Sequence, residues 1–133
     1  MILGHGVDIV NNNRIANLVN KYGEHFKGKI LSPKELIYYT NSNYLAKRFA
    51  AKEALSKAIG AGISKTGFQN VSVINNELGK PFIECSQKVK KLIIRTYNLS
   101  LNDIDKISFH LSLSDEKEYS IASIIMELRN FES

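Results

Sequence analysis

Alternating hydrophobic and polar positions predict strands at both ends of the chain. A first strand is expected at residues 2–10, where the alternation separates two faces. One face carries Leu3, His5, Val7 and Ile9, and the other carries Ile2, Gly4, Gly6 and Asp8. Because His5 shares its face with apolar residues, we expect it to lie in the core. Further strands are expected at 71–75, 81–85, 107–114 and 119–128, the last two forming a hairpin.

Helical spacing of hydrophobic residues characterises the middle of the chain. Ser32 and Glu35 have the spacing of a capping box, which predicts the start of one helix. The strongest helix is expected at 44–59, which is rich in Ala, Leu and Lys and is followed by Gly60. Shorter helices are expected between residue 11 and Gly23 and at 87–97. The pattern therefore predicts an α+β fold in which helices pack on a small, largely antiparallel sheet.

The composition is that of a globular chain in a reducing compartment. Its 133 residues suit a single domain spanning 1–133, and 44% hydrophobic with 23% charged residues excludes wholesale disorder. Cys85 is the only cysteine, which excludes an internal disulfide framework and favours a cytoplasmic location. No Lys or Arg precedes Asp8 and no apolar run approaches ~18 residues, so we expect neither a signal peptide nor a membrane partner.

Positive charge is concentrated in one part of the chain. There are 18 Lys and Arg against 13 Asp and Glu, a net charge of +5, and the whole excess lies in residues 21–57. Such a concentrated field favours an anionic partner, although a solvated helical surface would have the same charge. Charge alone is compatible with nucleic acid, a nucleotide or an acidic protein.

Two carboxylates are candidates for chemistry. Asp8 shares its strand face with Gly4 and Gly6, which leave room for a ligand or another backbone. Alternatively, Asp8 caps the turn that follows it. Glu53 and Lys57 lie one helical turn apart and form either part of a site or an ordinary exposed ion pair.

Two further patterns suit an anionic ligand. Arg48 and Lys52 form a pair of like charge one turn apart, which is unfavourable unless an anion lies near them. On the strand at 107–114, one face carries only polar residues, including His110 and Ser112. These side chains can donate hydrogen bonds to phosphate oxygens, or can form a solvated face with an incidental histidine.

Together these segments resemble one family, the holo-acyl-carrier-protein synthases, which are small phosphopantetheinyl transferases. The matching segments are GVDIV at 6–10, Arg14, LSPKE at 31–35, RFAAKEALSKAIGAGI at 48–63, NELGKPFI at 76–83 and HLSLSD at 110–115. The resemblance extends from Met1 to about Leu128 and implies the 4′-phosphopantetheinyl transferase-like fold. Members of this family transfer the 4′-phosphopantetheine arm of coenzyme A to a serine of apo-acyl carrier protein, in support of fatty acid biosynthesis.

The resemblance implies a role for each matching residue. Asp8 and Glu53 match magnesium-binding carboxylates and, with Lys57, are the catalytic candidates; Glu53 is the candidate base. The positions that match coenzyme contacts are Arg48, Lys57, Gly60, Gly62, Gly79, Lys80, Pro81, His110 and Ser112. Arg14 matches a docking arginine for the acidic carrier protein, and we expect Lys21 to assist it. No nucleophile is expected in this chain, because the attacking hydroxyl belongs to the carrier.

The resemblance also implies an assembly. The short bacterial members are homotrimers with active sites between subunits, so Asp8 and Glu53 of one chain are expected to face the Gly79 and His110 strands of the next. Asp115 departs from the pattern, because the family often carries a second histidine there.

Two other function classes suit the basic segment. A small nucleic-acid-binding domain would use its Lys and Arg side chains together with Tyr38, Tyr39 and Tyr44. A non-catalytic docking module for carrier proteins would need only the basic surface. Neither class gives a reason for Asp8 and Glu53 in a positive region. We therefore expect coenzyme A and apo-acyl carrier protein as partners, without nucleic acid.

Overall fold

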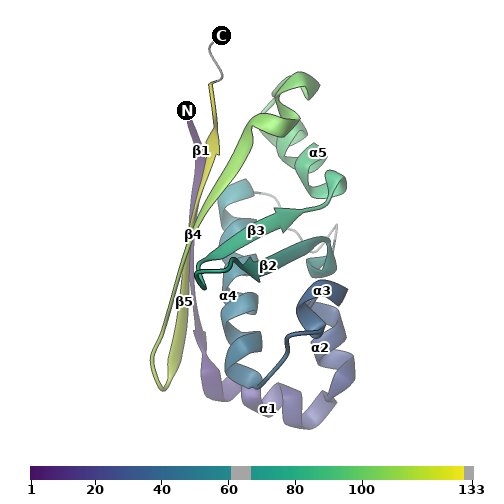
Figure 1. The fold of residues 1–133 in the computed structure, drawn as a ribbon, viewed down its shortest axis with the longest axis vertical. Helices are drawn as coiled ribbons and strands as arrows, with labels where there is room; N and C mark the ends of the chain where they lie inside the picture. Colours follow the sequence, from purple (N-terminus) through teal and green to yellow (C-terminus); the bar gives the residue numbers. More distant parts are fainter. Residues whose placement is uncertain (61–66, 131–133) are drawn as a thin grey trace.

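Two antiparallel sheets lie beside one long helix in the computed structural model, which describes residues 1–60 and 67–130 (Figure 1). The larger sheet has the strand order β1–β5–β4, and the smaller pairs β2 with β3. The strands are β1 (Ile2–Asn11), β2 (Val71–Asn75), β3 (Pro81–Cys85), β4 (Ile107–Asp115) and β5 (Tyr119–Leu128). All pairings are antiparallel, which confirms the predicted α+β class.

The helices cover one side of the larger sheet (Figure 1). They are α1 (Asn12–Tyr22), α2 (Glu24–Ile30), α3 (Pro33–Leu36), α4 (Ser42–Ile59) and α5 (Gln87–Thr96), with short 3₁₀ turns η2 (Phe68–Asn70) and η3 (Leu101–Lys106). The predicted capping box is present: the Glu35 N–H donates to Ser32 Oγ, and Glu35 Oε1 accepts from the Ser32 N–H. Helix α4 begins two residues earlier than expected because Asn41 Oδ1 accepts a hydrogen bond from the Tyr44 N–H and caps it.

The face of β1 that meets α4 is its glycine face. A Cβ atom on Gly6 would lie 1.8 Å from the Ala54 carbonyl oxygen, and one on Gly4 would lie 2.1 Å from that of Ala58. The two glycines thus let the helix backbone approach the strand directly. Of the two interpretations of this glycine face, close approach of another backbone is confirmed.

The opposite face of β1 is exposed, and the prediction of a core position for His5 is wrong. Val7 is 46% exposed and Ile9 is 59% exposed. His5 is also exposed, and its Nε2 lies 3.3 Å from Ser123 Oγ on β5. The alternation separated the two faces correctly from Gly4 onward, but Ile2 was assigned to the wrong face, because the register with β5 shifts between Ile2 and Gly4. Contact with α4 decided which face is buried.

The core lies between α4 and the two sheets. Small side chains on α4 allow close packing, since Ala46, Ala50, Ala51 and Ala54 are fully buried. Opposite them, β5 contributes Ala122, Ile124 and Met126, all fully buried. Within residues 1–60 and 67–130, no helix combines the length and hydrophobicity needed to cross a membrane.

Candidate active site

Asp8 and Lys57 meet beside Glu53 where α4 crosses the edge strand β1. Lys57 Nζ donates hydrogen bonds to Asp8 Oδ1 at 3.1 Å and to the Val7 carbonyl oxygen at 3.0 Å. The Asp8 side chain is 15% exposed and that of Lys57 is 57% exposed, so the pair opens to solvent. The structure therefore brings together the three predicted catalytic residues.

The backbone around Asp8 is held from both sides. Gly6 contacts the backbone of α4, and Asn11 caps α1 by accepting hydrogen bonds from the N–H groups of Asn13 and Arg14 at 2.9 and 3.2 Å. Because Asn11 makes these capping bonds, the alternative role of Asp8 as the cap is wrong. Its carboxylate instead accepts a hydrogen bond from Lys57.

In this cluster, partial burial and the neighbouring charges shift the pKa of Glu53. Partial burial and then the Asp8 charge raise the pKa of the Glu53 carboxyl above its usual value, while Lys57 and Arg14 lower it. No third histidine, cysteine or acidic residue joins these carboxylates to form a metal-binding group in the part of the chain that the structure describes. Two carboxylates with an open side fit a magnesium ion, which commonly takes one or two protein carboxylates and completes its shell with phosphate oxygens and water.

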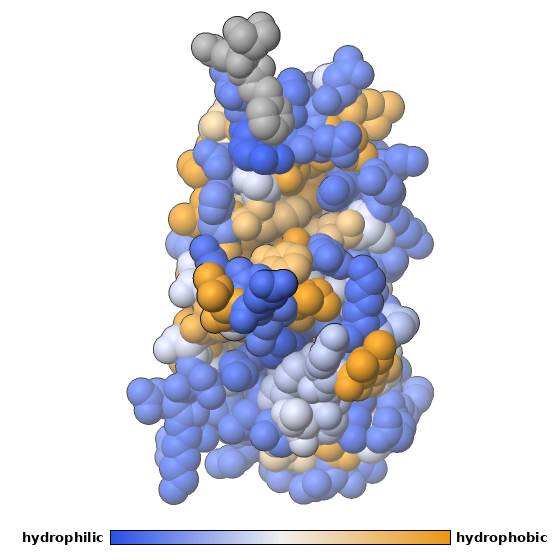
Figure 2. Space-filling model, in the orientation of Figure 1, coloured by the Kyte–Doolittle hydropathy of each residue, from blue (hydrophilic) through white to orange (hydrophobic). Residues whose placement is uncertain are grey.

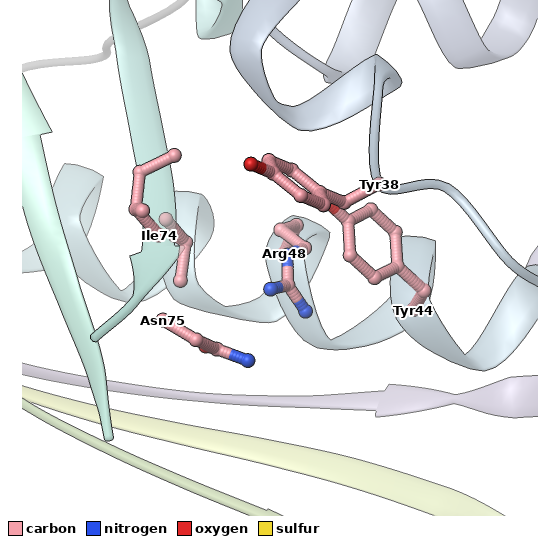
Figure 3. Close-up of a pocket in the computed structure, with 6 residues that line it drawn as sticks. Tyr38, Tyr44, Arg48, Ile74 and Asn75 are labelled. Atoms are coloured by element: carbon pink, nitrogen blue, oxygen red, sulfur yellow. The ribbon is translucent and has the colours of Figure 1, made fainter. Parts of the chain in front are cut away.

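Arg48 lies on a different side of α4, in a cavity of about 330 Å³ between that helix and β2 (Figure 3). The residues lining it are Tyr38, Tyr44, Arg48, Val73, Ile74 and Asn75. Arg48 is only 5% exposed, and its guanidinium carbon lies 3.7 Å from the centroid of the Tyr44 ring. Burial lowers the pKa of Arg48, and its Nε has no hydrogen-bond partner among the described residues. This arrangement suits a planar, anionic ligand.

The turn between β2 and β3 adjoins this cavity. Gly79 has a φ of 83°, which favours glycine, and its N–H donates to the Asn76 carbonyl oxygen. The Lys80 N–H donates to Asn76 Oδ1 at 2.9 Å. Gly79 and Pro81 share a hollow with Arg48, so these predicted coenzyme-binding residues lie together within one chain.

The remaining predicted coenzyme contacts lie elsewhere. Gly60 caps α4 with a φ of 80°, and Gly62 is outside the described residues. His110 and Ser112 lie on the exposed face of β4, on the side of the larger sheet away from α4, and the fold of one chain does not join them to Asp8. His110 Nε2 lies 2.9 Å from Glu127 Oε1, and this bond lowers the pKa of the Glu127 carboxyl.

The predicted docking residues are exposed on α1. Arg14 lies in the first turn of α1, and its charge lowers the pKa of Glu53, whereas Lys21 lies at the far end of the helix. Between α1 and α2 is a hollow lined by Leu18, Tyr22, His25, Phe26 and Lys29. Apolar and cationic groups thus occur side by side on this surface.

A buried ion pair between Lys52 and Glu35 was not predicted. Both side chains are 0% exposed, and Glu35 supplies the anion that the like-charged Arg48–Lys52 spacing required. The like-charged spacing of Arg48 and Lys52 is the signal for it in the sequence, and the capping box accounts for only one of the two roles of Glu35. The pair connects α4 to the start of α3.

Comparison with known proteins gives consistent matches over almost the whole chain. The family model of the 4′-phosphopantetheinyl transferase superfamily matches residues 4–122. The holo-[acyl-carrier-protein] synthase of Pelagibacter ubique is 40% identical over 131 residues, covering 95% of this chain and 97% of the relative. That of Vesicomyosocius okutanii is 41% identical over 135 residues, covering 98% of this chain and 100% of the relative.

Solved structures show the same likeness in three dimensions. Holo-[acyl-carrier-protein] synthase from Neisseria meningitidis is similar with a TM-score of 0.80 and 39% identity, over 96% of this chain and 99% of the other. The Bacillus anthracis enzyme in complex with CoA (3′,5′-ADP) has a TM-score of 0.76 and 32% identity, over 97% of this chain and 99% of the other.

Proposed function

The chain belongs to the 4′-phosphopantetheinyl transferase superfamily, and on that basis we propose that it is a holo-acyl-carrier-protein synthase. It transfers 4′-phosphopantetheine from coenzyme A to a serine of apo-acyl carrier protein, giving the holo form and adenosine 3′,5′-bisphosphate. The observation that carries this proposal is the meeting of Asp8, Glu53 and Lys57 in a chain 40% identical to such an enzyme. The lone cysteine, Cys85, accords with a cytoplasmic setting.

The cluster at β1 suits the chemical step. The carrier's serine oxygen attacks the phosphorus that bears pantetheine, and the bond to the departing nucleotide phosphate breaks. We assign Asp8 and Glu53 to a magnesium ion, which would offset charge on the diphosphate. Lys57, whose side chain is 57% exposed and hydrogen-bonded to Asp8, would turn from Asp8 to the leaving phosphate. The raised pKa of Glu53 suits a base that takes the serine proton, either directly or through a water.

The coenzyme's remaining groups would extend away from this cluster. Arg48 offers a cation to these groups. The adjoining turn, formed by Gly79, Lys80 and Pro81, allows its backbone to approach them closely. We assign further coenzyme contacts to His110 and Ser112, and to Gly60 and Gly62 at the end of α4.

The exposed face of the larger sheet suits contact with other copies of the chain. The face of the molecule shown in Figure 2 is mostly hydrophilic, with hydrophobic residues in separate patches. By contrast, the sheet exposes a contiguous apolar group: Val7, Ile9, Tyr119, Ile121 and Ile125 are each between 38% and 59% exposed. We propose a homotrimer that covers this face. Because His110 and Ser112 share the face, trimerisation would bring them to a neighbour's active site.

The carrier protein is proposed to dock on α1. Arg14 lies near Glu53, so a carrier held there would present its serine to the carboxylates. Lys21 and the hollow beside Tyr22 and Phe26 would contact the acidic helices of the carrier.

Mass spectrometry of the carrier tests the activity. Purified protein is incubated with apo-acyl carrier protein, coenzyme A and magnesium, and the carrier is expected to gain the mass of phosphopantetheine. Asp8→Ala and Glu53→Ala should abolish the gain, whereas Asp105→Ala, an exposed carboxylate on η3, should not. No mass gain with a competent carrier would leave only a non-catalytic role, such as a docking module.

A further inference from the structure

An ion pair with no solvent exposure lies next to Arg48. The side chains of Lys52 and Glu35 are both 0% exposed. Lys52 Nζ donates to Glu35 Oε1, to the Ile30 carbonyl oxygen at 2.6 Å and to the Phe68 carbonyl oxygen at 3.1 Å. All three hydrogens of the ammonium group are therefore used within the protein.

The Glu35 carboxylate is engaged at both oxygens. Oε1 also accepts from the Ser32 N–H at 2.8 Å, and Oε2 accepts from the Val73 N–H at 2.9 Å. These bonds tie the start of α3 and strand β2 to α4. Lys52 supplies the one cation that is paired with this carboxylate in the described part of the chain.

Arg48 lies one turn before Lys52 on α4 and makes no ion pair with a described residue. Its guanidinium stacks on the Tyr44 ring, and the Tyr44 hydroxyl donates to the Glu35 carbonyl oxygen at 2.7 Å. In Figure 3 the guanidinium projects into the cavity toward Asn75. Asp115, at the edge of the adjoining hollow, is exposed and therefore well screened by water.

Among the described residues, this buried region contains two cations, Arg48 and Lys52, and one carboxylate, Glu35, which is paired with Lys52. We propose that Lys52 is a positioning residue for ligand binding: by occupying Glu35, it keeps the Arg48 guanidinium unpaired and directed into the cavity, where it receives a phosphate group of the coenzyme. Without the lysine charge, Glu35 would attract the neighbouring guanidinium and compete with the ligand for it. The inference rests on the proposed function, in which Arg48 contacts coenzyme A.

Titration calorimetry with adenosine 3′,5′-bisphosphate and with coenzyme A tests this competition. Lys52→Met leaves an unpaired carboxylate beside Arg48, so affinity should fall by about tenfold or more, the equivalent of one charge-assisted contact. The double variant Glu35→Gln with Lys52→Met has no carboxylate to attract Arg48. Its affinity should return to within about twofold of that of Glu35→Gln alone, even though its unfolding temperature does not recover.

A purely structural role gives a different result. Affinity for the two nucleotides would then fall together with the unfolding temperature, and the double variant would bind them no better than Lys52→Met does. That outcome overturns the proposal. Lys52→Gln, which retains a donor for the Ile30 carbonyl, provides the same comparison if Lys52→Met does not fold. Arg48→Met tests the premise separately. If it leaves both affinities unchanged while the protein still transfers phosphopantetheine, the role of Arg48 and the positioning proposal fail together, but the proposed activity stands.

Discussion

Replacing Gly6 with alanine should disable the enzyme without removing any functional group. The added Cβ would lie 1.8 Å from the Ala54 carbonyl oxygen and 2.9 Å from the Ala58 nitrogen. Both neighbours are backbone atoms of α4, so no side-chain rotation relieves the clash. Strand and helix must separate instead.

The required movement is large relative to the tolerance of an active site. Restoring an ordinary contact of 3.4 Å from 1.8 Å needs about 1.6 Å of displacement. Asp8 lies two residues beyond Gly6 on the same strand face, and Glu53 directly precedes Ala54, so the displacement changes the separation of the two carboxylates. A misplacement of about 1 Å can reduce a rate about 100-fold, and overpacking of this kind commonly costs about 1–3 kcal/mol of stability.

Two measurements and one matched control test this reasoning. We expect kcat/KM for carrier modification to fall about 100-fold per folded molecule, with denaturant unfolding showing a loss toward the upper end of that range. Gly28→Ala is the control, because an added Cβ there meets nothing within 4 Å and the residue lies inside α2. That substitution should leave activity unchanged and stabilise the protein slightly. If Gly6→Ala retained normal turnover and stability, close backbone contact would not be what positions Asp8.

Three other substitutions address the carrier, the base and the assembly. Arg14→Glu should raise the KM for carrier protein about tenfold or more while barely changing that for coenzyme A; equal effects on both would contradict a separate docking surface. Glu53→Gln should lower kcat about 10²–10⁴-fold. Because the pKa of Glu53 is raised on folding, its ionisation destabilises the folded state as pH rises through that pKa, so Glu53→Gln should raise the unfolding temperature at pH 7 but not at pH 3. Ile125→Arg should convert the proposed trimer to smaller species in sedimentation velocity, and an assembly of unchanged size would contradict an interface on this face.

Local signals predicted most of the elements. The Ser32–Glu35 capping box and the β4–β5 hairpin depend on contacts between residues close in the sequence, and both are present. Helix α2 was missed because it has only seven residues, too few to show a hydrophobic repeat. The pairing of β1 with β5 joins opposite ends of the chain, which no local pattern specifies.

The candidate site was predicted to differing extents. The resemblance identified Asp8, Glu53 and Lys57, and the structure brings them together. It also identified Arg48, but not that the residue is buried in a cavity beside Tyr44 with no ion-pair partner among the described residues. That environment depends on how α4, β2 and the segment after α3 pack against one another.

The sequence by itself determined the order of the strands and of the longer helices, the alternation of faces along most of each strand, and the residue types available for chemistry. Only the tertiary structure decided which face of β1 is buried, because glycine allows the α4 backbone to approach more closely than any apolar side chain would. For the same reason His5 and Val7 are left exposed. The tertiary structure also decided how the charges pair. Glu35 and Lys52 are 17 positions apart, and only the packing of α3 against α4 assigns that carboxylate to the lysine and leaves Arg48 without an ion pair to any described residue.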